Sequence, residues 1–592
     1  MKKKKDKISD ISIKLVFLIF IFLRFLFDGI SEPYFNYFWN FVFFFLFIFF
    51  IIRERFKISF FPEEFFLLLF FLFSVISSGL SEIRYSGADY IPQFLSYFCF
   101  LFLFTRIFKR QDNSLLWWII MASSFCVILY GLHQHFWGLE ATRKYIYSHP
   151  EIKKILPPTF FERMESERIF SRFLYPNIYA CFLLMVFPFA FFLTFISGKI
   201  KILNLILLIL AVYSLFLTGS VGGIFVLLFI IQIMLVAFLI KDGKRLSVFI
   251  SLLIFFEIAG IVAGYKSGIL PHFTSLRDRL NYWEAGFKII KDNFLFGVGP
   301  ENFKYFFLKY KSPGVMEAKH AHNLFIEVFS EQGFLGFLFI SAFLSVFLIR
   351  MLKCRKNLFT LSITFSFLAG FLHNMIDFDF YDPAVSFFLF TVAGWGIINC
   401  EDSISKRFNP LTKMVTYLII LIVIFAWILN YRFMMAKRIW ESSLKEYNPA
   451  VALSLLNKAE KFYPFLKIYS GKGEIYYNIG LKKRDYRYIS EAERVYRQAI
   501  GINPYVPQFY RRLGFIYEME GEREKAERMY LNMVERYPAK KQYNMELAIF
   551  YKKYHKIDKF REFYERSKKL TPVTLEESKI VERYEKWIKS QR

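Results

Sequence analysis

The chain has 592 residues, among them 80 Phe and 36 Tyr, and 55% of its residues are hydrophobic. This composition excludes a soluble globular protein, because the apolar runs repeatedly approach the roughly 20 residues that cross a bilayer as a helix. We expect an all-α, polytopic helical membrane protein. The net charge of +27 does not indicate a nucleic-acid partner, because much of the Lys and Arg falls between apolar runs or in the C-terminal tail.

The chain begins with the lysine-rich stretch MKKKKDK, which is followed by an apolar run. No cleavage site of small residues follows, so we expect a retained first span with a cytoplasmic N-terminus. Further spans are predicted near residues 35–52, 64–80, 91–108, 115–132, 177–197, 200–217, 222–240, 246–265, 334–351, 358–376, 384–400 and 413–430. This pattern predicts about 12–13 transmembrane helices.

Charge alternates between the loops that join these spans. Basic runs occur at residues 53–57, 106–110, 199–201, 241–245, 350–356 and 405–407, all on the side of the N-terminal lysines. This bias follows the positive-inside rule. The opposite side, the periplasm or outer surface of a bacterium, receives the loops 133–176 and 266–333 and the tail after residue 430. We therefore predict a multi-pass protein of the bacterial inner membrane.

The five cysteines lie within the predicted spans or at their ends, and no CxxC pair is present. From this distribution we expect neither a disulfide nor a thiolate zinc site.

The tail changes to charged helical sequence with a regular period. Pro504, Pro538 and Pro572 are spaced by 34 residues, whereas Pro464 precedes Pro504 by 40, which indicates a small insertion. Buried-type residues keep the same phase relative to these prolines, and the pattern resembles the tetratricopeptide consensus. We expect a transmembrane domain over residues 1–430 and, over 431–592, an α-solenoid of tetratricopeptide repeats that binds a protein partner or another domain.

The central loop concentrates groups that are capable of chemistry, among them Arg277, Arg279, His320 and His322. A guanidinium group is a planar fork of donors that suits phosphate, and imidazole suits proton transfer. Together they fit a reaction with a phosphate leaving group on a lipid-linked substrate. The alternative is that the arginines bind lipid head groups and the histidines cap a helix, and on chemistry alone the two interpretations are equal. A metal site at the two histidines has less support, because the nearest acids are separated from them by helical sequence.

Ordered motifs in this region resemble the signature loop of the O-antigen ligase and O-antigen polymerase superfamily. The chain has R-x3-W from Arg279, then FGVGPENF over 296–303, and then HAHNLFIE over 320–327, followed by Gln332 and Gly333. Two further stretches agree: Arg168 with Pro-Asn before a span, and a His–Asp turn at 373–383. The resemblance runs from about Arg168 to Trp395.

The resemblance implies an inverting, metal-independent glycosyltransferase without a cofactor. Such an enzyme moves a glycan from undecaprenyl diphosphate to an acceptor hydroxyl at the periplasmic face of the lipid bilayer. In this sequence the resemblance assigns donor diphosphate binding to Arg279 and Arg168, and the catalytic role of general base to His322. We also expect Arg172 to bind the donor diphosphate, and we expect supporting roles for His320, Asn323, Glu327, His373 and Asp377. A fixed cation would stabilise the negative charge that grows on the leaving diphosphate.

One departure from the family pattern concerns the short outer turn at 218–223. The family often has Ser-Arg-Gly there, whereas this chain has Ser220, Val221 and Gly222. A diphosphate-binding arginine is therefore missing from that position. Arg172, Arg277 and Lys319 are the candidates to replace its charge.

The sequence leaves the acceptor open. A lipid A core would make the protein a ligase, a growing glycan would make it a polymerase, and a protein Ser or Thr would make it an O-oligosaccharyltransferase. Two interpretations from other classes remain: a polysaccharide transporter, and a tetratricopeptide scaffold with an inactive membrane domain. The transporter has less support, because the polar groups lie in outer loops rather than on broken helices at mid-membrane.

Overall fold

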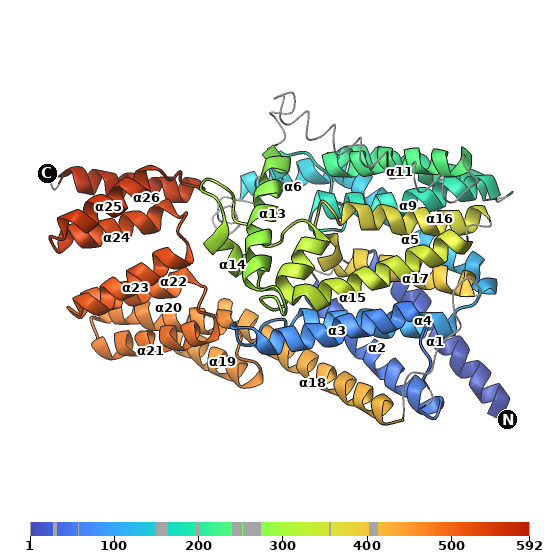
Figure 1. Cartoon of the computed structure of the whole chain (residues 1–592), viewed down its shortest axis with the longest axis horizontal. Coiled ribbons are helices and arrows are strands. Elements are labelled where there is room, and N and C mark those ends of the chain that lie inside the picture. The colour runs from blue at the N-terminus through green and yellow to red at the C-terminus, as the bar shows by residue number, and fades with distance from the viewer. Residues whose placement is uncertain are drawn as a thin grey trace. The chain divides into compact units, whose positions relative to one another are not determined.

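A computed structural model describes residues 2–27, 32–56, 58–149, 151, 161, 164–196, 198, 200–239, 252, 274–354, 357–401 and 413–590. Helices make up nearly all of its regular structure, as predicted (Figure 1). They are α1 (Lys2–Arg24), α2 (Pro33–Arg53), α3 (Pro62–Leu80), α4 (Tyr90–Ile107), η1 (Arg110–Asp112), α5 (Asn113–His133), η2 (Gln134–Gly138), α6 (Leu139–Ser148), α9 (Pro176–Ile196), α10 (Lys201–Leu217), α11 (Val221–Leu239), α13 (Thr274–Asp292), α14 (Phe303–Tyr310), α15 (Leu324–Cys354), α16 (Leu358–His373), η3 (Asp379–Tyr381), α17 (Pro383–Asn399), α18 (Lys413–Leu444), α19 (Pro449–Phe462), α20 (Leu466–Lys483), α21 (Tyr486–Ile502), α22 (Pro507–Met519), α23 (Arg523–Arg536), α24 (Lys541–Lys553), α25 (Ile557–Lys568) and α26 (Leu575–Ser590).

Among the described residues, seven helices are long and apolar enough to cross a membrane. They are α2, α3, α4, the run Arg110–Ser148, α9, α15 and α18, and the shorter apolar helices are α10, α11, α16 and α17. Helices thus occupy the predicted spans, except the one at 246–265, which lies outside the described residues. The chain is therefore an all-α polytopic membrane protein.

The chain divides into two compact units. Unit 1 comprises residues 1–69, 93–272 and 339–424, and unit 2 comprises residues 70–92, 273–338 and 425–592. Unit 2 therefore joins the central segment, residues 273–338, to the tail. The domain boundary at residue 430 stays a prediction.

Within unit 1, α9 packs against both α10 and α16, and the side chains along α9 and α17 are almost all buried. Two buried ion pairs fasten the first turn of α3. The Arg350 guanidinium donates to both oxygens of Glu63 at 2.6 and 3.0 Å, and Arg106 pairs with Glu64. Both arginines belong to the basic runs predicted at 106–110 and 350–356. In the structure their side chains are buried and form ion pairs with carboxylates.

One expectation is wrong. Cys354, at the end of α15, and Cys400, just after α17, form a disulfide with a Cα–Cα distance of 5.7 Å. No disulfide was expected from the sequence, because the cysteines lie within the predicted spans or at their ends and no CxxC pair is present. The two cysteines are 46 residues apart, and only the packing of these helix ends brings them together.

Within unit 2, the central segment and residues 81–89 pack directly on the tail. The backbone N–H of Arg84 donates to the carbonyl of Ile502 at 2.8 Å, and the rings of Phe306 and Tyr505 lie 4.0 Å apart. The Lys311 ammonium donates to the Tyr537 hydroxyl at 2.9 Å. The central segment and the tail therefore belong to one compact unit.

Helices α20 to α25 of the tail follow one another as helix pairs, α20 with α21, α22 with α23, and α24 with α25 (Figure 1). Small residues lie where paired helices touch: Gly514 on α22 faces the ring of Tyr530 on α23, so closely that a Cβ atom there would collide with it. The predicted insertion is taken up by longer helices, because α20 and α21 have 18 and 17 residues whereas α22 and α23 have 13 and 14. Membership of the tetratricopeptide family stays a prediction.

Candidate functional site

The motif FGVGP forms a turn that is tied to the backbone of α15. The N–H groups of Val298 and Gly299 donate to the carbonyls of Ser330 and Glu331 at 2.9 and 2.7 Å. Gly297 and Gly299 have φ of 67° and 93°, which glycine adopts most readily. A Cβ atom on Gly297 would overlap the Glu331 backbone. The glycines are therefore required for this close approach.

Gly333 breaks α15 at the same place. Its φ of 67° and ψ of −168° are non-helical, and they separate a short first part of α15 from its long apolar part. The following N–H, of Phe334, donates to the Phe294 carbonyl at 2.8 Å. A Cβ atom on Gly333 would overlap the Leu295 carbonyl. The segment 294–299 therefore runs against the break in α15.

Glu331 and two serines make further hydrogen bonds around the turn at 297–299. The Glu331 carboxylate accepts the N–H of Phe303 at 3.1 Å, at the start of α14. The Ser77 hydroxyl donates to the Glu331 carbonyl at 2.9 Å, and the Ser81 hydroxyl donates to the Val298 carbonyl at 2.6 Å. Glu331 is therefore a structural residue of the central segment.

His320 is buried and paired with a carboxylate. Its Nδ1 lies 2.8 Å from Oε1 of Glu327, and the Ala321 N–H donates to the other oxygen of the same carboxylate. Burial holds the pKa of His320 well below its usual value, and the charge of Lys319 lowers it further. The imidazole is therefore neutral at physiological pH, and only 6% of the residue is exposed.

His322, by contrast, is only partly buried and has a φ of 53°, in the left-handed region. Its ring centre lies 5.5 Å from that of Tyr282 on α13. The next residue, Asn323, accepts the N–H groups of Phe325 and Ile326 at 3.0 and 3.1 Å and thereby caps α15. His322 is thus placed at a helix N-terminus, where the helix dipole favours negative charge.

Arg279 lies on α13, one turn before Tyr282, and is half-buried. Burial raises the pKa of the Tyr282 hydroxyl to about 12, and the positive charge of Arg279 acts in the opposite direction. Arg279 and His322 therefore both lie near Tyr282. Arg277, on the same helix, is exposed.

Arg168 belongs to unit 1 and lies against the outer turn at 218–223. Its Nε donates to the Thr218 carbonyl at 2.6 Å, and one terminal nitrogen donates to Asn177 Oδ1 at 2.7 Å. The Asn177 amide donates in turn to Asp377 at 2.7 Å. Arg168 therefore holds its charge beside the turn that contains Val221, and Asp377 supports it through Asn177.

Arg172 is exposed; its Nε donates to the Leu26 carbonyl at 3.0 Å, and its guanidinium lies 5.1 Å from the ring centre of Tyr130. Donor diphosphate binding by Arg172 stays a prediction.

His373 is buried, and its Nδ1 pairs with Asp379 at 2.6 Å rather than with Asp377. Within the described part of the chain, Cys181, His373 and Asp379 form the one group whose ligand atoms, within 4.8 Å of one another, could hold a metal ion. The predicted pair His320 and His322 does not belong to such a group. That glycan transfer needs no metal ion stays a prediction.

The predicted site residues thus fall in two clusters. Unit 2 holds Arg279, His320, His322, Asn323 and Glu327, and unit 1 holds Arg168, Arg172, His373 and Asp377. Sequence reasoning missed Tyr282, and it named both Asp377 and Asp379 as groups that orient the histidine site or cap a helix, without choosing between them. The position of Tyr282, three residues after Arg279 on a helix, was a usable signal, whereas choosing Asp379 over Asp377 required the turn geometry.

A protein-family model matches the central part of the chain. The model of the O-Antigen ligase family matches residues 206–341, which include Val221, Arg279, His320, His322 and Glu327. The resemblance stated from the motifs is confirmed over this region. No curated protein matches the chain.

Proposed function

Because residues 206–341 match the O-antigen ligase family, we propose that the protein transfers a glycan from undecaprenyl diphosphate to an acceptor hydroxyl at the periplasmic face of the inner membrane. The observation that carries the proposal is the grouping of Arg279 and His322 around Tyr282 inside the matched region. A phosphate-binding cation and a partly exposed proton acceptor are the two groups that this reaction needs.

In the proposed reaction His322 is the general base. It accepts the proton of the acceptor hydroxyl while the hydroxyl oxygen attacks the anomeric carbon of the donor sugar from the face opposite the diphosphate. The bond between that carbon and the diphosphate oxygen breaks, and undecaprenyl diphosphate leaves with the electron pair. His322 suits this role better than His320, because its side chain is more exposed and the imidazole of His320 is engaged with Glu327.

Arg279 would bind the leaving diphosphate. A guanidinium group forms two parallel hydrogen bonds to phosphate oxygens and stays charged at every physiological pH. Because negative charge grows on the diphosphate as the bond breaks, this interaction stabilises the transition state more than the bound donor.

Arg168 is the second cation that we assign to the donor. Its bonds to Thr218 and Asn177 fix its charge beside the turn of Val221, where the family often has an arginine. Arg168 therefore supports the view that the charge missing at Val221 is supplied from a different part of the sequence. We assign Asp377 to the positioning of Arg168, and Arg172 to a secondary role in donor binding.

Three acceptors fit the proposed reaction equally well: a lipid A core, a growing glycan and a protein Ser or Thr. Each of them attacks through a hydroxyl group. The tail would bind a partner or the acceptor itself. We place the protein in the inner membrane of a bacterium, with the central segment and the tail on the outer side.

The donor site is tested by a charge-conserving substitution. Arg279→Lys keeps the charge but loses the fork, so its transfer rate should fall nearly as far as that of Arg279→Ala, by about 10²-fold or more. The rate of transfer from undecaprenyl-diphosphate glycan is measured against donor concentration at equal protein level. Arg528→Lys, at an exposed position on α23 of the tail, is the control. Wild-type rates for Arg279→Lys would exclude the donor-binding role.

A further inference from the structure

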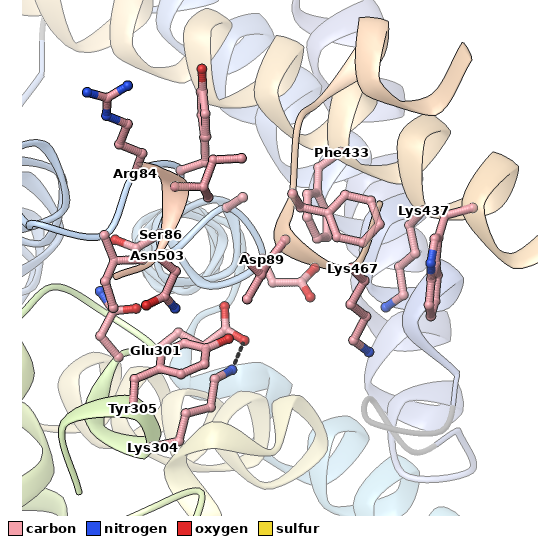
Figure 2. Close-up of a pocket in the computed structure, with 18 residues that line it drawn as sticks. Arg84, Ser86, Asp89, Glu301, Lys304, Tyr305, Phe433, Lys437, Lys467 and Asn503 are labelled. Carbon is pink, nitrogen blue, oxygen red and sulfur yellow. Dashed lines mark hydrogen bonds and ion pairs between the residues drawn. The ribbon is translucent and has the colours of Figure 1, made fainter. Parts of the chain in front are cut away.

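A pocket of about 180 Å³ lies inside unit 2, where the central segment meets the tail (Figure 2). Its walls come from residues 83–89 after α3, residues 301–305 around the start of α14, the last turns of α18, the start of α20 and the end of α21. No residue that we assign to catalysis or donor binding lines it.

Positive charge dominates the pocket. Four cations line it, Arg84, Lys304, Lys437 and Lys467, against the two carboxylates of Asp89 and Glu301. Figure 2 shows Lys437 and Lys467 on the side of Asp89, and Lys304 beside Glu301, with the dashed line marking the 2.9 Å ion pair of Lys304 and Glu301. The guanidinium of Arg84 points away from this group. Three lysine side chains and two carboxylates therefore lie around the pocket.

The lysines also repel one another. The pKa of Lys467 is lowered by burial and, beyond that, by the nearby charges of Lys437 and Lys304. Crowded ammonium groups of this kind are stabilised by a bound anion, which removes the repulsion. An anionic ligand is thus favoured by the charges that the fold already holds together.

A buried donor and several rings complete the lining. Asn503 is 1% exposed, and its Nδ2 makes no hydrogen bond of normal geometry to the described residues, although it lies near the Tyr305 hydroxyl. The rings of Trp440 and Phe465 form an apolar wall, with their centres 5.8 Å apart. A polar donor, cations and flat apolar rings are together suited to a sugar that carries an acidic group.

A second pocket, of about 340 Å³, adjoins the first. It shares Lys304 and Tyr305 with the first pocket and is also lined by Glu317, Ala318 and Lys319. Lys319 is the neighbour of His320 in the chain. A glycan longer than one sugar unit could therefore extend from the first pocket into the second.

We propose that the first pocket binds one saccharide unit of the acceptor glycan, and that this unit carries a carboxylate or a phosphate. That the glycan is the acceptor rests on the proposed transferase function. The volume is below the roughly 300–1,000 Å³ of pockets for drug-sized ligands, so it takes about one sugar unit. By holding that unit, the tail would select an acidic glycan as acceptor.

Binding is measured by isothermal titration of the full chain in detergent with trigalacturonate, glucose 6-phosphate and neutral maltotriose. We expect an anionic probe to bind, and maltotriose to bind at least about tenfold more weakly. The preferred anionic probe identifies the acidic group as carboxylate or phosphate, and either result supports the proposal. Failure of both anionic probes to bind, or equal binding of maltotriose, would overturn it.

Variants locate the binding. Lys437→Gln with Lys467→Gln should weaken the anionic probe about tenfold or more, because two charge-assisted contacts are lost. Asn503→Asp should also weaken it, because this nearly isosteric change keeps the oxygen that accepts the Tyr505 N–H and adds a negative charge. The control, Lys445→Gln with Lys458→Gln, changes two exposed lysines outside the pocket and should bind as wild type. Wild-type binding by the Lys437 and Lys467 double variant would overturn the assignment to this pocket.

His322→Ala separates this proposal from the proposed function. The variant should bind the probe as wild type does while losing transfer. Normal transfer by His322→Ala would remove the proposed catalytic role and leave the binding result intact, whereas loss of pocket binding with intact transfer by the wild-type chain would remove only the pocket.

Discussion

At the scale of single residues, His320 and His322 are given opposite environments by the same short loop. His320 points into unit 2, where its Nδ1 is hydrogen-bonded to Glu327 and burial keeps the imidazole neutral. His322 lies at the partly exposed N-terminus of α15 beside Tyr282. One histidine therefore holds the loop in place, and the other is accessible to a substrate.

The lowered pKa of His320 predicts how stability changes with pH. Between its folded pKa and its unfolded value near 6.5, the unfolded chain binds more protons at this group, so stability falls as pH falls below about 6.5. The loss amounts to at most about 1.4 kcal/mol for each pH unit.

His320→Gln, which removes this titration, should therefore show a smaller decrease in thermal unfolding temperature between pH 7.5 and 5.5 than the wild type. The measurement is thermal unfolding in detergent at each pH, with His555→Gln, at a histidine of the tail, as control. An equal decrease in wild type and His320→Gln would contradict the assignment of a buried, neutral imidazole.

The roles of single residues were only partly predictable from sequence. The order of motifs predicted roles for Arg279 and His322, because the proposed chemistry needs those residue types on one face of the membrane, and these roles stay a proposal. It could not reveal that Glu327 pairs with His320, or that Asp379 rather than Asp377 pairs with His373. Those pairings depend on turns whose backbone path is set by tertiary packing.

At the scale of elements, the break in α15 is the feature that builds the site. Gly333 lets the chain turn so that residues 294–299 run alongside it, and this contact fixes α13 relative to the loop of His322. The sequence indicated helix between the histidines and the acids that follow them, and it predicted a span beginning near residue 334, but it did not show that Gly333 breaks one continuous element between the two. Apolar periodicity locates the long part of α15 and says nothing about a polar turn of helix.

Gly333→Ala should disrupt this arrangement. A Cβ atom would overlap the Leu295 carbonyl, and the backbone conformation itself disfavours any residue with a Cβ, at a cost of about 1–3 kcal/mol. We expect a lower unfolding temperature and a loss of transfer although His322 is unchanged. Gly79→Ala, on α3 with open space around its Cβ position, is the control and should behave as wild type. Normal stability and transfer in Gly333→Ala would show that the break is not required.

At the scale of the whole molecule, the central segment and the tail must face the same side of the membrane. They pack on each other within unit 2, through contacts such as that between Arg84 and Ile502. The sequence predicted a common side from the basic loops and an odd number of spans, but it treated the tail as a separate domain. Periodicity in the tail shows helix pairs and does not show which surface covers them.

The proposed orientation places both on the outside. A phosphatase fused after Arg592 should be active and a fluorescent protein at the same position should be dark, because the first reporter needs the periplasm and the second the cytoplasm. A fusion within the loop at 241–245, predicted to be cytoplasmic, is the control with the opposite pattern. Fluorescence from the fusion after Arg592 together with an inactive phosphatase would overturn the orientation.

The most direct test of the central claim is transfer by the purified protein from undecaprenyl-diphosphate glycan, with wild type, His322→Ala and His320→Gln compared at equal folded amount. The account predicts that wild type transfers, that His322→Ala falls by about 10²–10⁴-fold without a lower unfolding temperature, and that His320→Gln loses stability and keeps most of its transfer per folded molecule. Equal, mild losses in both variants would contradict the assignment of His322 as the general base.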